Sequence, residues 1–420
     1  MTAVDARTSA QFFAAPSLFL IAGLVAAGQF AALVFSPAIP DAARALAVTP
    51  AAVLLSATAF LGATALTQLV AGPLTDRFGR RNLILIGLVL YLIGGAVSGV
   101  ATSLETLIAG RVVQAIGAAF ALVAARAATR DLFEGPALQR AMATITLAFA
   151  LAPAFAPLAG GVATQLGGFR AVFGLTLVLG LILFALAAFR FPETHRASQR
   201  LEARRGSLWA AYGAVLKDEG FRHSALIAGL ANAAMTAFFV GAPILMIEHL
   251  GVEPAEFGLY PPLAVIGFAL GTLFVRSAMA KLSSDQLVAI GAALMAIGAA
   301  ALLIPALTIG PAVWPINFAM IIFITGLGVL VPTVSAQALE AQGERAGSAA
   351  ALLGVSQMAI GAIAAAIVAS IESHAPLISF QAVMALSVVA IGIVIGVRAW
   401  GQRASQRRDV LSGALKEDES

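Results

Sequence analysis

The sequence contains no cysteine and only four histidines among its 420 residues. The lack of cysteine excludes disulfide bonds, thiolate metal sites and cysteine nucleophiles. The histidines are far apart in the sequence and form no H-x-x-x-H pair: His195, His223, His249 and His374. Because closely spaced histidines are the usual signature of a helical metal site, we predict no metal site and no cofactor.

Charged residues are also scarce, since Asp, Glu, Lys and Arg make up 11% of the chain and hydrophobic residues 60%. A soluble protein of average composition carries about 25% charged residues. So few charges argue against a soluble enzyme, a nucleic-acid-binding protein and a disordered protein. The composition favours a polytopic membrane protein, and the 40 glycines agree with it, because glycine is more frequent in membrane helices than in soluble ones.

Eleven runs of the chain contain no charged residue at all. They are 8–40, 45–75, 82–104, 112–125, 141–169, 171–189, 223–247, 257–275, 286–339, 346–371 and 373–397. A spanning helix needs about 20 mostly apolar residues. The run 286–339 is too long for one span, and Pro305, Gly310, Pro311 and Pro315 divide it into two. With Arg111 included, the short run also becomes a span, so the sequence predicts an all-α membrane protein with twelve transmembrane helices.

The basic residues are sorted between alternate loops. All but three of the 25 Lys and Arg residues lie on the side that carries both termini, the exceptions being Arg44 and Arg170 on the other side and Arg111 within a span. Because cytoplasmic loops are enriched in Lys and Arg, we predict that both termini are cytoplasmic, in the inner (plasma) membrane of a bacterial-type cell.

The longest polar stretch lies near the middle of the chain. It divides the sequence into a six-helix half at 1–191, a cytoplasmic linker at 192–221, a second six-helix half at 222–398 and a cytoplasmic tail at 399–420. Two six-helix halves are typical of an internally duplicated transporter, with the substrate site between the halves. An undivided bundle with one long loop is the alternative.

A loop rich in glycine and arginine follows the second predicted span. Its glycines permit close approach or positive φ, its aspartate can cap a helix or pair with a base, and its arginines can anchor at anionic headgroups. The residues concerned are Gly72, Asp76, Arg77, Gly79, Arg80 and Arg81. Positive-inside anchoring alone is the simpler interpretation.

Two further spans contain unusual residues. Arg111 places a cation within the fourth span, where it either faces a cavity or a partner or snorkels to the interface. The fifth span contains Pro153 and Pro157 one turn apart, which predicts a bend, followed by Gly160 and Gly161, which permit close helix packing. A structural kink without a functional role is the alternative for the prolines.

These motifs resemble those of the major facilitator superfamily. The order G-x-x-x-D-R-x-G-R-R at 72–81 is similar to its signature loop, and R-x-x-Q-x-x-G-A at 111–118 is similar to a second motif, with Ala115 where glycine is usual. The string L-A-P-A-F-A-P-L-A-G-G at 151–161 resembles the antiporter motif of the Bcr/CflA drug-resistance branch. Further matches to that branch lie at 125–133, 168–173, 192–194 and 241–258.

The resemblance implies roles for several of these residues. It implies that Asp76 and the loop arginines latch the two halves together on the cytoplasmic side, and Arg345, just before the eleventh span, is a candidate partner for Asp76. It implies that Arg111 takes part in proton-linked conformational change. It also implies a monomer with alternating access, with protons as a possible coupling ion.

One position departs from the branch. Its drug/proton antiporters carry an aspartate four residues before the first proline at the end of the first span, and Leu33 stands there in this chain. No Asp or Glu lies in the interior of a predicted span, and Asp41, Glu105, Glu248, Glu340 and Glu372 lie at helix ends. Because proton exchange ordinarily needs a group that titrates within the cavity, this departure weakens the prediction of proton antiport.

The candidate substrate contacts are amides and aromatic rings in apolar surroundings. They are Gln29, Phe30, Phe35, Gln114, Asn232, Phe239, Asn317 and Gln357. Each amide can equally join helices to one another, and each ring can belong to the core. A cavity with amides, rings, one arginine and no acid suits a neutral or anionic planar solute better than a cation.

The sequence therefore favours a secondary transporter of a small organic solute in a lipid bilayer. The resemblance predicts multidrug efflux, whereas the missing acid leaves uptake of a nutrient or cofactor, such as a riboflavin-like vitamin, as the alternative. A passive channel is a more remote alternative. An ATP-driven pump is excluded because none of the three lysines follows a Walker-type glycine, and no nucleophile with a neighbouring base predicts an enzyme.

Overall fold

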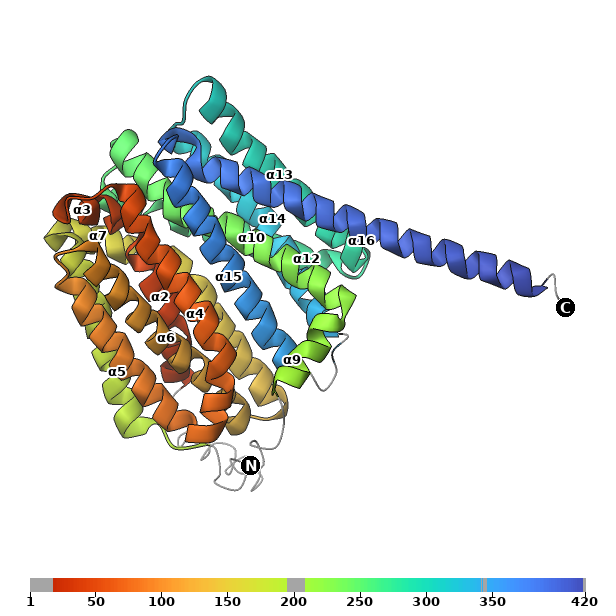
Figure 1. Ribbon diagram of the computed structural model, residues 1–420, viewed down its shortest axis with the longest axis horizontal. Coiled ribbons are helices and arrows are strands. Elements are labelled where there is room, and N and C mark those ends of the chain that lie inside the picture. The colour runs from red at the N-terminus through yellow and green to blue at the C-terminus, as the bar shows by residue number, and fades with distance from the viewer. Residues whose placement is uncertain (1–17, 195–207, 341, 343–345, 418–420) are drawn as a thin grey trace, which may run out of the picture.

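The computed structural model describes residues 18–194, 208–340, 342 and 346–417, which form helices joined by short connections (Figure 1). The first group comprises α2 (Leu18–Val34), η1 (Ser36–Ala38), α3 (Ile39–Ala45), α4 (Pro50–Phe78), α5 (Arg80–Gly99), α6 (Leu104–Leu132) and α7 (Gly135–Arg190). The second comprises α9 (Leu208–Lys217), α10 (Glu219–Pro243), η2 (Ile244–His249), α11 (Pro254–Phe257), α12 (Tyr260–Ala278), α13 (Ser284–Thr308), α14 (Val313–Glu340), α15 (Ala346–Glu372), η4 (Pro376–Ile378) and α16 (Ser379–Glu417).

Eleven of these helical segments are long and apolar enough to cross a membrane. One of them lies in α7, whose 56 residues far exceed one crossing, because a spanning helix needs only about 20. The backbone of α7 leaves the helical conformation at Gly167 and Gly168, where Gly168 has φ 66°. The element is thus two spans joined at a tight glycine turn, and the prediction of an all-α protein with twelve transmembrane helices is confirmed.

Local sequence signals explain several helix ends. The hydroxyl groups of Thr49, Ser103 and Ser283 accept hydrogen bonds from backbone N–H groups in the first turns of α4, α6 and α13, which satisfies donors that a helix leaves unpaired. Within the charge-free run 286–339, helix α13 ends at Thr308 and helix α14 begins at Val313. Gly310, with φ 91°, lies in that connection, as its glycine and prolines predict.

The helices form two bundles, with α2–α7 on one side and α10–α16 on the other (Figure 1). In the first, α5 packs along α6 and α2 along α7; in the second, α13 packs along α14 and α10 along α15. The bundles meet where α4 packs along α15, where α7 contacts α11 and α12, and where η1 and α3 contact α10 and η2. The division into halves at 1–191 and 222–398, with the linker at 192–221, remains a prediction.

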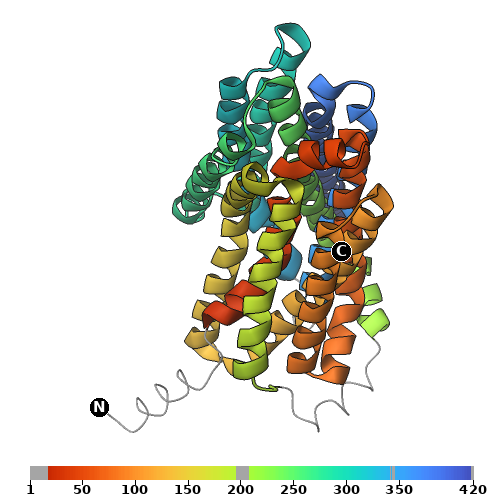
Figure 2. The ribbon, with the colours of Figure 1, turned by 90° about the vertical axis from the view of Figure 1, so that its left-hand side faces the viewer.

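The two ends of the molecule carry different elements. The closed side carries α3, η2 and η4, and Figure 2 shows α3 at that end of the α2–α7 bundle. The linker side carries the turn between α4 and α5, the end of α7 and helix α9. Helix α16 continues beyond the other helices on the linker side (Figure 1), so the predicted tail at 399–420 is helical as far as Glu417.

Glycines let particular helices pack backbone against backbone. A Cβ atom on Gly94 of α5 would lie 2.2 Å from the backbone nitrogen of Gln114, and one on Gly117 of α6 would lie 2.3 Å from the carbonyl oxygen of Gly87. In the second bundle, a Cβ atom on Gly291 of α13 would lie 2.9 Å from the carbonyl oxygen of Gly326. These close approaches hold α6 directly against α5 and α14 directly against α13.

Candidate functional site

Arg111 is buried at the centre of the α2–α7 bundle, with 1% of its surface exposed. Its Nη1 donates hydrogen bonds to the carbonyl oxygen of Ala31 and to Oε1 of Gln114, both at 2.9 Å. Its guanidinium carbon lies 4.1 Å from the ring centroid of Phe60 and 5.5 Å from that of Phe35. The side chain is therefore held inside the bundle by α2, α4 and α6, and the interpretation that it snorkels to the interface is wrong.

The positive charge of Arg111 has no carboxylate partner in the part of the chain that the structure describes. Its Nε and Nη2 atoms have no hydrogen-bond partner there, and neither has the buried hydroxyl group of Tyr91. Aromatic rings attract a cation by about 0.5–2 kcal/mol and leave its N–H groups free. The arrangement keeps a positive charge and two unpartnered donor nitrogen atoms available inside the membrane region.

A hollow lies next to this arginine, between the two bundles. Phe60, on which the guanidinium group stacks, also lines the hollow. The lining further includes Gln29, Thr64, Gln68, Phe149 and Met358. Met358 belongs to α15 and the others to α2, α4 and α7, so both bundles contribute. Amides, a hydroxyl group, aromatic rings and apolar side chains line the hollow, and none of its described lining residues is charged.

The two bundles are joined on the closed side by three described hydrogen bonds. The Ser36 hydroxyl group donates to the carbonyl oxygen of Phe239 (2.5 Å), and Arg44 Nη1 donates to Glu248 Oε1 (2.7 Å). Gln165 Nε2 donates to Glu253 Oε2 (2.9 Å). These contacts close this side of the molecule over the hollow.

The predicted glycines of the fifth span make the same closure tight. A Cβ atom on Gly160 would lie 1.9 Å from the carbonyl oxygen of Val34 of α2, and one on Gly161 would lie 2.1 Å from that of Pro254 of α11. The two glycines thus bring α7 against one helix of each bundle. The helix continues through Pro153 and Pro157, and its break falls later, at Gly167 and Gly168.

On the linker side, the signature loop forms a charge network within the first bundle. Arg80 is 7% exposed, and its side chain pairs with Asp76 and with Asp131 of α6, while its backbone N–H donates to Glu193 Oε1 (2.9 Å). The prediction that Arg80 anchors at headgroups is therefore wrong, because its partners are carboxylates within the protein. Arg81 Nη2 donates to the carbonyl oxygen of Ala188 (2.8 Å).

The other loop residues differ in their surroundings. Gly79 has φ 93°, as its type predicts. Gly72 lies inside α4 with open space around it, so neither close approach nor positive φ explains it. The Arg77 guanidinium group lies over the ring of Phe78 (5.5 Å), and both side chains are on the surface. Arg345, the predicted partner of Asp76, lies outside the described residues.

The predicted substrate contacts fall into separate groups. Gln29 lines the hollow, and Gln114 and Phe35 surround Arg111. Phe30 is half-buried against the core. In the second bundle, Asn232 Nδ2 donates to the carbonyl oxygen of Gln357 (2.8 Å), which joins α10 to α15.

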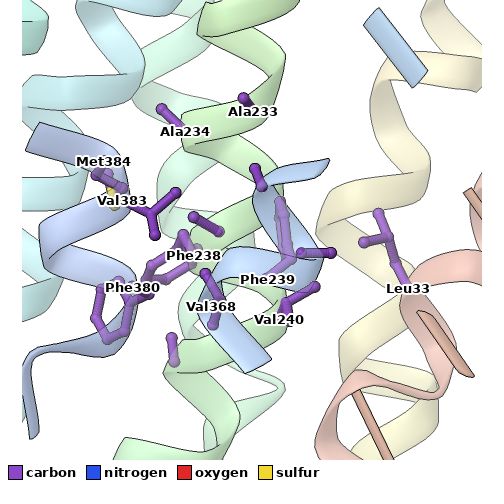
Figure 3. Close-up of a cluster of buried hydrophobic side chains, with 14 of the residues drawn as sticks. Leu33, Ala233, Ala234, Phe238, Phe239, Val240, Val368, Phe380, Val383 and Met384 are labelled. Atoms are coloured by element: carbon purple, nitrogen blue, oxygen red, sulfur yellow. The ribbon is translucent and has the colours of Figure 1, made fainter. Parts of the chain in front are cut away.

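Two further candidates belong to the second bundle. Asn317 Nδ2 donates to the carbonyl oxygen of Val313 in its own helix (2.8 Å). Phe239 packs edge-on against Phe238, whose ring packs in the same way against Phe380. Figure 3 shows these rings on α10 and α16 and Leu33 on α2 of the other bundle. Leu33 is 9% exposed and belongs to the same apolar core, where the resembling antiporters carry their aspartate.

Comparison with known proteins assigns the family. The Major Facilitator Superfamily profile matches residues 18–366, which is most of the chain. The chain belongs to the major facilitator superfamily. Like other members of this superfamily it is a multi-pass membrane protein, and the superfamily's carriers transport small molecules.

Two curated relatives place this facilitator near the drug-resistance branch. It is 30% identical over 386 residues to multidrug resistance protein D of Escherichia coli K12, covering 91% of this chain and 94% of the relative. It is 28% identical over 359 residues to a bicyclomycin resistance protein homolog of Haemophilus influenzae, covering 85% and 90%. The resemblance to the Bcr/CflA branch is therefore confirmed.

A solved structure supports the fold of this facilitator independently. The crystal structure of a D-xylose–proton symporter superposes with a TM-score of 0.69, covering 89% of this chain and 96% of that chain at 14% identity. At that identity the likeness concerns the fold alone.

Sequence reasoning missed the residues that join the bundles on the closed side. The sequence gives no signal for Ser36, and it indicates only that Arg44 lies on the side opposite the termini and that Glu248 lies at a helix end. The partners in the Arg44–Glu248 pair lie 204 positions apart, so no local motif shows the contact. The signal that the sequence does offer is the positive charge of Arg44, because it is one of only two basic residues predicted on that side.

Proposed function

We propose that this facilitator exports a small, mainly neutral organic solute from the cell by alternating access, as a multidrug efflux transporter. The hollow between the bundles carries the proposal. Its described lining offers amides, aromatic rings and aliphatic side chains to a solute and no charged group that would select one charge pattern, and sites with few polar groups accept several ligands of similar size. The names of the relatives, multidrug and bicyclomycin resistance, support the same function.

The proposed orientation places the linker side in the cytoplasm, on the inner side of a bacterial plasma membrane. The distribution of Lys and Arg supports this orientation. The closed side then faces outward, and the structure corresponds to the state that loads solute from the cytoplasm. The protein acts as a monomer in which the halves at 1–191 and 222–398 rock against each other, and the proton gradient drives the exchange.

Arg111 is proposed to couple the solute to this motion. The N–H groups of its unpartnered Nε and Nη2 atoms lie beside the ring of Phe60, which lines the hollow. A solute carbonyl or a displaced backbone carbonyl can accept from them, and either change alters how α2, α4 and α6 pack. Gly160 and Gly161 pack at the closed end of the same bundle, and the Asp76–Arg80 network lies at its linker end, so both ends are expected to respond to this change.

The function is tested by the accumulation of three probes in bacteria that lack their main efflux pumps. The probes are radiolabelled bicyclomycin (neutral), ethidium (a cation) and riboflavin. Cells expressing the chain are expected to hold several-fold less bicyclomycin than cells carrying an empty vector. Arg111→Met is expected to abolish the difference, whereas Gly62→Ala is expected to leave it unchanged, because a methyl group at Gly62 meets no atom within 4 Å.

Two outcomes contradict the proposal separately. Unchanged bicyclomycin and ethidium with increased riboflavin would contradict efflux and favour vitamin uptake. Bicyclomycin efflux that persists after a protonophore collapses the gradient would leave efflux standing and overturn the proton coupling.

A further inference from the structure

Arg126 of α6 is a cation beside the hollow that the proposed mechanism does not use. Its guanidinium carbon lies 5.5 Å from the ring centroid of Phe149, and Phe149 lines the hollow. On α6 itself, Ala119 and Leu122 also line the hollow. Arg126 follows them by seven and four residues, spacings that keep side chains on one face of a helix. The guanidinium group therefore lies at the edge of the hollow.

This edge is the one toward the linker side. Helix α6 starts at Leu104 near the closed side and ends at Leu132 on the linker side. Because a helix rises about 1.5 Å per residue, the Cα atom of Arg126 lies about 6 Å beyond that of Leu122 in this direction. In the proposed orientation, a solute that approaches from the cytoplasm passes Arg126 as it enters the hollow.

The charge of Arg126 is not neutralised by any carboxylate among the residues that the structure describes. The carboxylates of Asp76, Asp131 and Glu193, at the same end of the bundle, all contact Arg80. The ring of Phe149 attracts the cation but accepts no ordinary hydrogen bond from it. Since the side chain is only half-buried, its N–H groups are accessible to a ligand.

A second cation reinforces the charge at this entrance. Arg130 is exposed and follows Arg126 by one helical turn on the same face of α6. Clefts lined by charges of one sign concentrate ligands of the opposite sign and repel ligands of the same sign. The hollow itself selects no charge, whereas its linker-side entrance favours an anion.

The two regions suit the two parts of one kind of molecule. The aromatic and aliphatic lining of the hollow accepts an apolar ring system. The planar guanidinium group of arginine binds a carboxylate through two parallel hydrogen bonds. Arg111 is less suited to this contact, because it is 1% exposed and enclosed by α2, α4 and α6.

We propose that Arg126 recognises the negative charge of the transported solute, so that the hollow takes up aromatic monoanions such as aryl carboxylates in preference to their neutral analogues. Cations of the same size are rejected by Arg126 and Arg130. The inference rests on the proposed function, since it names the class of solute that the hollow binds best. It makes Arg126 a residue that determines specificity.

The test compares three ligands that share one ring system and differ in charge. They are tritiated 2-naphthoate (an anion), 2-naphthamide (neutral) and 2-naphthylmethylammonium (a cation), at about pH 7.5, where carboxyl groups are ionised and aliphatic amines protonated. Binding is measured on full-length protein in nanodiscs of zwitterionic phosphatidylcholine, with empty nanodiscs as background. We expect the Kd of naphthoate to be at least about tenfold below that of naphthamide, and the cation to bind most weakly.

Substitutions assign this preference to Arg126. Arg126→Gln and Arg126→Met remove the charge, and both are expected to bring the Kd of naphthoate to within about twofold of that of naphthamide, whose own Kd stays unchanged. Arg126→Lys keeps the charge and is expected to retain part of the preference. Arg190→Gln is the matched control, because it removes an exposed arginine at the linker-side end of α7, and it is expected to bind as the parent protein does.

Three results would overturn the proposal. The first is a parent protein that binds naphthoate no better than naphthamide. The second is a preference that persists in whichever of Arg126→Gln and Arg126→Met folds, including the case in which Arg111→Met removes it instead. The third is an equal loss in Arg190→Gln, which would assign the preference to net charge.

The binding assay contains no transport step. A failure of bicyclomycin efflux in cells therefore leaves the charge preference standing, and a failure of the charge preference leaves efflux standing.

Discussion

Arg111 is the residue whose environment departs most from ordinary membrane-protein packing. A guanidinium group at the centre of a spanning helix costs about 2.5–3.5 kcal/mol on insertion scales. Hydrogen bonds from a charged donor return about 1.5–3 kcal/mol each, and the rings of Phe60 and Phe35 add about 0.5–2 kcal/mol. Arg111 makes two such bonds and leaves two donor atoms unpartnered, each of which costs about 1–3 kcal/mol. The sum is near zero, so stability alone does not explain the residue.

A substitution separates a role in stability from a role in transport. Arg111→Met keeps the length of the side chain and removes its charge, so we expect the free energy of unfolding to change by no more than about 1–2 kcal/mol. We expect solute transport to fall by at least about tenfold, equivalent to about 1.4 kcal/mol. Thermal unfolding followed by circular dichroism and the bicyclomycin assay measure the two quantities.

Arg80→Met is the comparison, since Arg80 is also buried but pairs with Asp76 and Asp131. Removing it leaves two carboxylates without their cation, which makes a larger loss of stability the expected result. If Arg111→Met unfolded the protein as readily as Arg80→Met, Arg111 would be a structural residue.

At the scale of elements, the glycines of neighbouring helices follow one pattern in both bundles. Gly87 and Gly94 of α5 are seven residues apart and pack on α6, and Gly291 and Gly298 of α13 have the same spacing and pack on α14. Gly87 faces Gly117, and Gly291 faces Gly326, each against the other's carbonyl oxygen. A seven-residue spacing keeps small residues on one face over two turns. The same glycine packing therefore occurs in both bundles.

The close helix packing at these glycines predicts where the protein does not tolerate an added methyl group. In Gly94→Ala the new Cβ atom would lie 2.2 Å from the backbone of Gln114, so the helices must separate, and overpacking of this kind costs about 1–3 kcal/mol or more. We expect a lower thermal unfolding midpoint and loss of transport through displacement of Arg111.

The matched control for this prediction is Gly62→Ala in α4, where the added methyl group meets nothing within 4 Å. Alanine favours the helix over glycine by about 0.5–1 kcal/mol, which makes equal or greater stability the expected result. Equal unfolding midpoints for Gly94→Ala and Gly62→Ala would contradict the close packing of α5 on α6.

The spans were predictable from sequence because the membrane imposes a simple requirement. A charge-free run of about 20 residues is enough to indicate a span, and the breaks near Pro311 and Gly168 follow from local backbone preferences. The partners of Arg80 were not predictable in this way. Asp131 lies in α6 and Glu193 follows α7, and a single sequence contains no signal for which of several loop carboxylates is brought close.

For the whole molecule, the closed side depends on few polar contacts between the bundles. The Arg44–Glu248 pair is partly exposed, with 62% and 32% of the two side chains accessible. Pairs of this kind contribute about 0.2–1 kcal/mol. A contact with so small a free energy holds the two bundles together without preventing the reopening that alternating access requires.

A double-mutant cycle measures this contact. Arg44→Ala and Glu248→Ala are each expected to raise the open-to-closed ratio by about two- to fivefold, and the double variant is expected to add nothing further. The distance between spin labels at Thr102→Cys and Thr308→Cys, both exposed and the only cysteines in the chain, gives the ratio by pulsed dipolar spectroscopy. The effect is expected to shrink at high salt, and fully additive single effects would show that the pair does not couple the bundles.

The sequence predicts a latch at the other end of the molecule, on the linker side. Resemblance to the superfamily implies that Asp76 joins the two halves there, with Arg345 as its candidate partner. This pairing stays a prediction, since Arg345 lies outside the described residues. One structure presents one arrangement of a transporter, whereas the sequence encodes the contacts of all of them. The closed-side contacts could not be derived from sequence, because their partners belong to different bundles and meet in only some arrangements.

The Arg44–Glu248 pair also bears on the symmetry of the molecule. Its separation of 204 residues is the separation of Gly87 from Gly291 and of Gly94 from Gly298, so the two charges occupy corresponding positions in the two bundles. In a symmetric pair of identical units, such a position faces its own copy, and two like charges would meet there. Because the two bundles of this chain differ in sequence, an arginine and a glutamate meet instead, and the contact attracts.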